Sequence, residues 1–308
     1  MRHNVKSFGE IQYTYVRLFA TLRVKTEDDI RILQQDLRSL QKWSDKWLLR
    51  FHPDKCVVMR VGKSNIPKAY YKMGAADNFT LKETLTEKDL GVYFDSDLKF
   101  EKHMQEKINK ANKMMGIIRK SFEYLDEESF LLLFRSMVRS HVEYANQVWC
   151  PHMKKHIDAL ENVQRRATKL IPGFKDLSYP DRLKKLDLPT LAYRRLRGDM
   201  IETFKIVRSN LGYDQAVVTG LLNRNFDSNT RGNVYKLEIQ RAKRDIRKYS
   251  FSFRVVRPWN SLPNDVVLSP TVNTFKHRLD RHWKDQLIKF DYTEQLQVNS
   301  NLKSSYPY

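Results

Sequence analysis

The spacing of apolar residues first becomes regular between residues 27 and 50. Leucine, isoleucine and tryptophan recur there three and four positions apart, which predicts an amphipathic helix with one buried face. Thr26, followed three positions later by Asp29, has the sequence of a capping box. The chain is therefore expected to enter its first helix directly after Thr26.

Two shorter stretches that follow have the composition of strands. Residues 55–61 are rich in β-branched valine and are followed by Gly62. Residues 88–94 are followed by the turn-like Asp95-Ser96-Asp97. Because such strands need a covered face, we expect them to pack side by side, with the helix of residues 27–50 over one face. Residues 1–101 are therefore predicted to form a section of mixed α and β structure.

Beyond residue 100 the apolar period becomes that of long helices. The first of these helices has an apolar face and, opposite it, a face rich in lysine. The second is apolar on several sides, as is typical of a helix at the centre of a bundle. We expect an all-helical unit over residues 102–212. Its helices are predicted at residues 100–122, 127–149, 157–170 and 190–208.

The last third of the chain opens with a change of composition. Residues 213–233 are rich in Gly, Asn, Asp and Ser, which predicts a linker or long loop. A final amphipathic helix is predicted at residues 275–287. Residues 213–308 would then form a third section. The fold class expected for the whole chain is α+β, mainly α.

Charge points to the kind of partner. The chain has 56 Lys and Arg against 36 Asp and Glu, a formal charge of +20, which favours a polyanion such as nucleic acid. Its 41% hydrophobic content suffices for a substantial core and excludes wholesale disorder. Only 10 glycines in 308 residues suit a mainly helical fold.

Cysteine content and hydropathy indicate the compartment. The two cysteines, Cys56 and Cys150, exclude a disulfide scaffold and a CxxC-type zinc site, which suits a reducing compartment. No apolar run has the length of a signal peptide or of a membrane helix. We therefore expect an intracellular protein, nuclear or cytoplasmic, that is not secreted and has no membrane partner.

Basic residues gather in three places suited to phosphate binding. The last of these adjoins Tyr249 and Phe251, and guanidinium groups pair with phosphates while aromatic rings stack on unpaired bases. Each cluster also fits a solvated surface, and the aromatic residues also fit a core. The candidates are Lys102, Lys110, Lys113 and Lys120; Arg165 and Arg166, with Arg194, Arg195 and Arg197; and Arg241, Lys243, Arg244, Arg247 and Lys248.

Four stretches, which together extend over almost the entire chain, resemble the C-terminal part of reverse transcriptases from non-LTR retrotransposons of the jockey and chicken-repeat type. The resemblance implies a lower palm remnant at residues 1–101, a thumb-like helical domain at 102–212 and a basic C-terminal extension at 213–308. It also implies RNA, DNA or an RNA–DNA hybrid as the partner. The stretches are Leu33–Leu37 through Trp43–Trp47 to Lys55-Cys56; Lys88–Val92 with Asp97–Phe100; Val138–Ala145 to Trp149 with Glu161–Lys169; and Arg254–Pro263 with Phe275–Asp280.

The same resemblance implies functional positions. Leu90-Gly91 is similar to the family's primer grip, where the backbone approaches the end of the nucleic acid, and the lysine-rich helical face is similar to the place where a polymerase thumb meets the duplex. In the family, two aspartates of a palm hairpin hold the catalytic Mg²⁺ ions. Here Leu18-Phe19-Ala20 is followed by Thr21-Leu22, which cannot hold two metal ions. The family's remaining metal-binding aspartate belongs to a palm strand that would precede this chain.

These features predict a truncated reverse transcriptase remnant that binds nucleic acid and lacks polymerase catalysis. No catalytic residue, metal site or cofactor is expected, although the intact family enzyme requires Mg²⁺. Three other groups of potential ligands have plainer interpretations, namely a helix start, a solvated turn and structural residues without a fourth zinc ligand. They are Asp28-Asp29; Asp95 and Asp97; and Cys150, His152 and His156.

Two other functions stay open. One is a helical protein-interaction module whose charge only maintains solubility, and the other is a fragment of a longer, active reverse transcriptase. Salt dependence separates nucleic-acid binding from the first of these, because affinity that depends on many phosphate contacts falls steeply with ionic strength.

Overall fold

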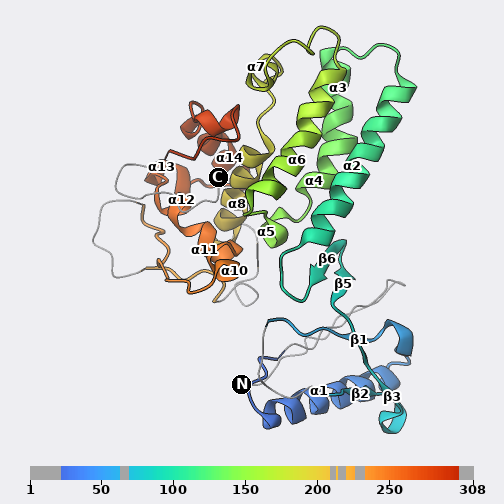
Figure 1. Ribbon diagram of the computed structural model, residues 1–308. Coiled ribbons are helices and arrows are strands. Elements are labelled where there is room, and N and C mark those ends of the chain that lie inside the picture. Colours follow the sequence, from blue (N-terminus) through green and yellow to red (C-terminus); the bar gives the residue numbers. More distant parts are fainter. Residues whose placement is uncertain (1–21, 63–68, 209–212, 214–219, 226–232, 298–308) are drawn as a thin grey trace. The chain divides into compact units, whose positions relative to one another are not determined.

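The computed structural model describes residues 22–62, 69–208, 213, 220–225 and 233–297. Within these ranges the chain is mainly helical with three two-stranded sheets (Figure 1), so the expected fold class is confirmed. The described residues belong to two compact units. The first contains those up to Glu87 together with Asp95–Asp97, and the second contains Lys88–Phe94 and those from Leu98 onward. No helix in the described part of the chain is both long and apolar enough to cross a membrane.

The first unit contains helix α1 (Glu27–Lys46), which begins as predicted. The Thr26 amide donates to Asp29 Oδ2 over 2.9 Å, and the Asp29 amide donates back to Thr26 Oγ1 over 3.3 Å, so the capping box is confirmed. The helix ends before the expected residue 50, because the backbone of Leu48 is left-handed, with φ of 56°. The Leu49 amide then donates to the Ser44 carbonyl over 3.0 Å.

Short strands and 3-10 turns surround the core of this unit. Strand β1 pairs in parallel with β4, and β2 pairs antiparallel with β3. Leu37 of α1 is buried with Tyr71, Met73 and Leu81. The elements are η1 (Pro53–Lys55), β1 (Val57–Val58), β2 (Lys72–Met73), η2 (Ala75–Asp77), β3 (Phe79–Thr80) and β4 (Lys82–Glu83).

The expectation of one strand at residues 88–94, packed beside the strand at residues 57–61, is wrong. A hairpin occupies this position, in which β5 (Thr86–Asp89) pairs with β6 (Val92–Asp95). Leu90 and Gly91 form the turn between them, with φ of 41° and 82°. Two consecutive residues with positive φ are what a two-residue hairpin turn requires. The partner of β1 is β4, not the segment around Leu90.

After the hairpin residues, the second unit continues with helices that pack side by side in Figure 1. Helix α2 has nearly the predicted bounds, but the single helix expected at residues 127–149 is divided. Its last turn is separated from the rest because Ala145 has φ of 54°. The buried Trp149 indole then donates to the Tyr144 carbonyl over 2.7 Å. The elements are α2 (Glu101–Ser121), α3 (Glu127–Leu133), the π-helical η3 (Phe134–Val138), α4 (Arg139–Glu143), α5 (Asn146–Trp149), α6 (Lys154–Ala167), η4 (Thr168–Leu170), α7 (Tyr179–Lys185) and α8 (Leu191–Val207).

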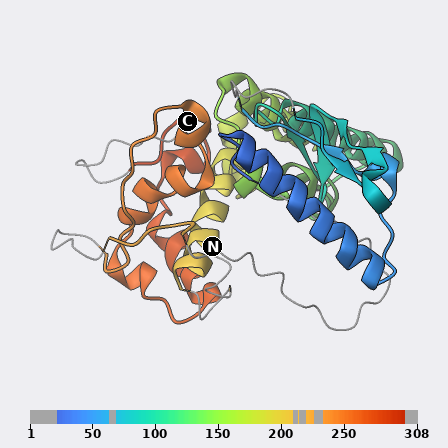
Figure 2. The same ribbon diagram turned by 90° about the horizontal axis from the view of Figure 1, so that it is seen from below.

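Short helices from the last third of the chain belong to this same unit. Figure 2 shows α8 in yellow beside these orange and red helices, and Phe204 of α8 stacks on Phe275 with ring centres 4.3 Å apart. The described residues before and after the expected boundary at residues 212–213 therefore belong to the same compact unit. The elements are α10 (Asp245–Lys248), α11 (Phe251–Arg254), α12 (Val256–Asn260), α13 (Asn264–Val267), α14 (Val272–His282) and η6 (Leu287–Lys289).

The stretch Arg254–Pro263 supplies polar contacts that hold this part in place. The buried Arg254 guanidinium bonds both carboxylate oxygens of the buried Asp199, over 2.8 and 2.9 Å. The Trp259 indole donates to the Tyr235 carbonyl over 2.8 Å. The Asn260 side chain bonds both the amide and the carbonyl of Leu237, each over 2.8 Å. These residues have a structural role, because they join α8 and the loop that contains Tyr235 and Leu237 to the C-terminal helices.

Candidate nucleic-acid interface

The hairpin turn places an apolar side chain in solvent. Leu90 is 76% exposed, although its φ of 41° is a conformation that costs an ordinary L-residue about 1 to 2 kcal/mol. Backbone strain of this kind persists only where the surroundings hold the residue in place, and it occurs often at functional positions.

Tyr144 provides that support. Its hydroxyl donates to the Leu90 carbonyl over 2.7 Å. A Cβ atom added to Gly91 would lie 3.3 Å from Tyr144 Cε1, and the φ of 82° at Gly91 also favours glycine. The turn therefore rests on a tyrosine ring that comes from the break between α4 and α5.

His103 of α2 holds the second strand of the hairpin. Its Nδ1 accepts a hydrogen bond from the Tyr93 amide over 3.2 Å, and its ring lies beside the buried Trp149, with ring centres 5.0 Å apart. Burial, together with the charge of Lys107, lowers the pKa of His103 to about 4. The imidazole is therefore neutral near pH 7, as an acceptor at Nδ1 must be.

Lysine side chains lie over the two aromatic rings next to this turn. Lys88 and Lys102 lie over the Tyr93 ring, with Nζ 5.4 and 5.0 Å from its centre, and Lys107 Nζ lies 5.2 Å from the centre of the Tyr144 ring. Burial lowers the pKa of Lys107, and the charges of Lys110 and Lys88 lower this pKa further. Like charges this close repel one another, so an anion bound among them would lower the electrostatic energy.

The remaining candidate lysines of α2 extend this basic surface along the helix. Lys102, Lys113 and Lys120 are exposed and fall on one face, and 18 residues of helix separate the first from the last, about 27 Å. Met104, Ala111 and Ile118 bury the opposite side of α2. The predicted division of this helix into an apolar and a cationic face is confirmed.

The cluster at residues 241–248 is also on the surface. All five of its basic side chains, from Arg241 to Lys248, are exposed, and Arg247 lies over the Phe253 ring at 4.8 Å. Tyr249 is stacked on the His152 ring, with ring centres 4.6 Å apart, so this ring already has an aromatic partner. The cationic groups, rather than the rings, are therefore the part of this cluster suited to a ligand.

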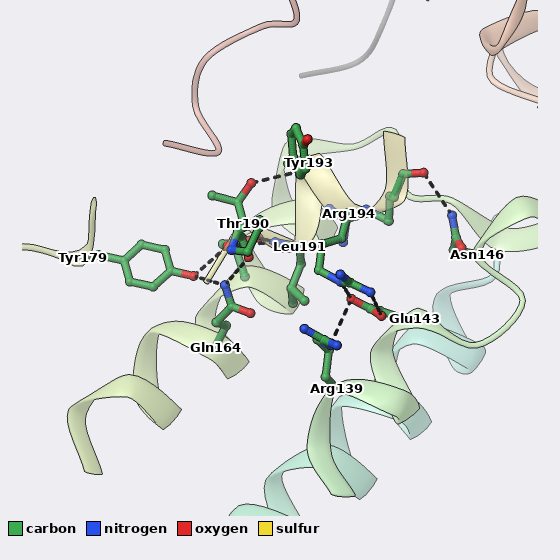
Figure 3. A network of polar contacts seen from close by, with 12 residues as sticks. Arg139, Glu143, Asn146, Gln164, Tyr179, Thr190, Leu191, Tyr193 and Arg194 are labelled. Atoms are coloured by element: carbon green, nitrogen blue, oxygen red, sulfur yellow. Dashed lines mark hydrogen bonds and ion pairs between the residues drawn. The ribbon is translucent and has the colours of Figure 1, made fainter. Parts of the chain in front are cut away.

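The arginines of α6 and α8 have partners within the unit. Arg165 is half-buried and donates to Tyr292 Oη over 2.8 Å, and Arg166 donates to Asn112 Oδ1 of α2 over 2.9 Å. Arg194 forms a two-bond ion pair with Glu143, which also faces Arg139 (Figure 3). These contacts of Arg165, Arg166 and Arg194 join parts of the second unit to one another. Arg197 of α8 likewise forms an ion pair with Asp280 of α14. Arg195 is buried.

Other buried polar contacts of Figure 3 have the same structural role. The Tyr179 hydroxyl donates to Glu161 Oε1 over 2.6 Å and accepts from the Gln164 amide over 3.1 Å. Glu161 also accepts from the Leu191 amide over 3.1 Å. Burial raises the pKa of Glu161, and these donors oppose that rise.

The alternative ligand groups lie in structural contacts. Asp29 caps α1, and Asp28 pairs with Arg31 over 3.1 Å. His156 bonds Glu101 over 3.3 Å, while His152 stacks on Tyr249. Within the described ranges no three His, Cys, Asp or Glu side chains are grouped so as to hold a metal ion. Residues 18–21, which belong to the stretch where the family's metal-binding hairpin was sought, lie outside the described residues.

Sequence reasoning missed several residues around the turn. Lys88 lies in β5 and Tyr93 in β6, each two residues from the Leu90-Gly91 turn. A prediction of the hairpin from the sequence would have placed both side chains near the turn. Lys107 is not on the lysine face that contains Lys102. Tyr144 reaches Leu90 across 54 residues of sequence, and no local signal predicts that contact. Searches among protein-family models, curated proteins and solved structures found no match to this chain.

Proposed function

We propose that this protein is a reverse transcriptase remnant of the non-LTR type that binds RNA, DNA or their hybrid without catalysing polymerisation. The observation that carries the proposal is the exposed Leu90-Gly91 turn, which Tyr144 holds and beside which three lysines lie over the rings of Tyr93 and Tyr144. Lysines around a fixed backbone turn provide contacts to phosphates without reading base sequence. The resemblance of Leu90-Gly91 to a primer grip supports the same interpretation.

The absence of catalysis is proposed from the sequence. Thr21-Leu22 follows Ala20 where the family has two aspartates, and neither side chain provides a carboxylate for Mg²⁺. With Mg²⁺ or Mn²⁺, a primed RNA template and nucleotides, the protein should extend no primer. Extension above a heat-inactivated control would overturn this part of the proposal.

Binding is tested by removal of charge at the turn. The variant Lys102→Gln/Lys107→Gln/Lys110→Gln should bind a fluorescently labelled hybrid more weakly than the wild type, with little loss of helix, because glutamine and lysine have similar helix propensities. The matched control removes three exposed lysines near α7, which lies at the other end of the second unit from the hairpin (Figure 1). That control is Lys169→Gln/Lys175→Gln/Lys184→Gln. Equal affinities of the two variants would contradict the placement of the site.

A protein-interaction module is the second candidate, because apolar side chains are exposed near the junction of α2 and α3. Ile117, Phe122, Tyr124 and Leu132 are each more than two-fifths exposed. Such groups favour protein contacts where they are contiguous. Binding to an apolar surface would depend much less on salt than binding to phosphates.

A further inference from the structure

We propose that Lys154 and Lys155, in the first turn of α6, join the hairpin with α2 and the cluster at residues 241–248 into one continuous nucleic-acid footprint. The inference rests on the proposed function. It adds two binding residues that belong to neither cluster, and it requires one nucleic-acid ligand to reach both clusters.

The start of α6 contacts the start of α2. Lys155 Nζ lies 2.9 Å from Glu101 Oε1, and His156 Nε2 lies 3.3 Å from the same oxygen. Glu101 directly precedes Lys102, which lies over the Tyr93 ring of the hairpin. The first turn of α6 therefore lies directly beside the start of α2, where the basic surface around the turn begins.

The same segment contacts the C-terminal basic cluster. The His152 ring lies on the Tyr249 ring, with centres 4.6 Å apart and planes 12° apart. Lys248, which precedes Tyr249, has its Nζ 4.9 Å from the centre of that ring. Only two residues separate His152 from Lys155, so at most about 11 Å of backbone joins the two contacts.

Charge on this bridging segment favours a polyanion. Lys154 and Lys155 are exposed, and Lys154 has no ionic partner among the described residues. The carboxylates nearby are Glu101, which pairs with Lys155, Asp158, which lies one helical turn after Lys154, and Asp245, whose charge acts on His152. Positive groups from α2, α6 and α10 therefore outnumber the negative ones, which suits a duplex or hybrid backbone with evenly spaced phosphates.

The test compares salt dependence in full-length variants. Fluorescence anisotropy would measure binding of an RNA–DNA hybrid of about 20 base pairs at several salt concentrations. In Lys154→Gln/Lys155→Gln, two lost phosphate contacts should reduce the slope of log affinity against log salt by about 1.8. The loss of affinity between about 50 and 200 mM salt should then be roughly tenfold smaller than in the wild type.

Two further variants make the result specific. Lys169→Gln/Lys175→Gln removes the same charge beyond the other end of α6, roughly 20 Å away, and should keep the wild-type slope. Lys154→Gln alone breaks no ion pair of the described chain and should reduce the slope by about 0.9. A steep wild-type slope that both Lys154 variants retain would overturn this inference and leave the proposed function standing. A wild type without salt-dependent binding would overturn the proposed function, and this inference with it.

Discussion

The Tyr144 hydroxyl donates a 2.7 Å hydrogen bond to the Leu90 carbonyl, and this bond joins the break between α4 and α5 to the tip of the hairpin. The Tyr144 ring also lies next to Gly91, and the Lys107 ammonium group lies over this ring. The Tyr144 side chain thus supports the turn, leaves room only for glycine at position 91 and lies beneath the Lys107 cation. The hairpin tip, residues 88–94, is therefore a part of the helical unit.

Gly91→Ala should destabilise the second unit by roughly 1 to 2 kcal/mol, because the new Cβ would meet both an unfavourable φ and the Tyr144 ring. Gly116→Ala is the matched control. Gly116 lies within α2 with open space around an added Cβ, so this substitution should stabilise the protein by up to about 1 kcal/mol. Urea unfolding followed by circular dichroism would measure both. Equal effects of the two substitutions would contradict the described turn.

Leu90→Asn should make the protein more stable and its nucleic-acid binding weaker. Asparagine adopts positive φ more readily than leucine, so about 1 kcal/mol of strain should be relieved. If the exposed Leu90 side chain contacts the ligand, the hybrid affinity should fall although every lysine is retained. Leu132→Asn, at another exposed leucine, should leave that affinity unchanged. Unchanged affinity in Leu90→Asn would show that the leucine side chain makes no contact with the ligand.

Arg254→Met should destabilise the second unit by about 3 to 5 kcal/mol, because it leaves the Asp199 carboxylate buried without its cation. Lys185→Ala, which removes an exposed ion pair with Glu127, should cost less than about 1 kcal/mol. Chemical denaturation of both variants makes the comparison. A small effect of Arg254→Met would contradict the described attachment of the C-terminal helices to α8.

Stability should also fall as the pH decreases from about 6.5 to about 4, partly because of His103. The pKa of His103 is about 4 in the folded protein against 6.5 when unfolded, so the unfolded chain binds a proton first. The contribution is fully present above pH 6.5, is lost as the pH falls through this range and amounts to no more than about 3 kcal/mol. His103→Gln should remove this component, whereas His282→Gln, at an exposed position, should retain it. Identical pH profiles for wild type and His103→Gln would contradict this assignment.

The sequence predicts those features that depend on local pattern. Thr26 and Asp29 define the start of α1, and the period of α2 separates its apolar side from Lys102, Lys113 and Lys120. It does not predict the hairpin, because a leucine at positive φ gives no turn signal.

Long-range contacts account for the other differences. Tyr144, at the break after α4, contacts the hairpin across 54 residues of sequence. The attachment of the C-terminal helices depends on Arg254 pairing with Asp199 across 55 residues. For the same reason, the approach of α6 to both basic clusters becomes visible only in the folded chain.

The most direct test of the account is the salt dependence of wild-type binding to an RNA–DNA hybrid. If six phosphates are neutralised, affinity should fall on the order of a thousandfold between roughly 50 and 200 mM salt. Arg241→Gln/Arg244→Gln/Arg247→Gln and Lys102→Gln/Lys113→Gln/Lys120→Gln should each reduce the slope, by about 0.9 for every contact removed. Affinity that changes little over this range, or variants whose slopes equal the wild-type slope, would contradict the account and favour a protein-interaction module.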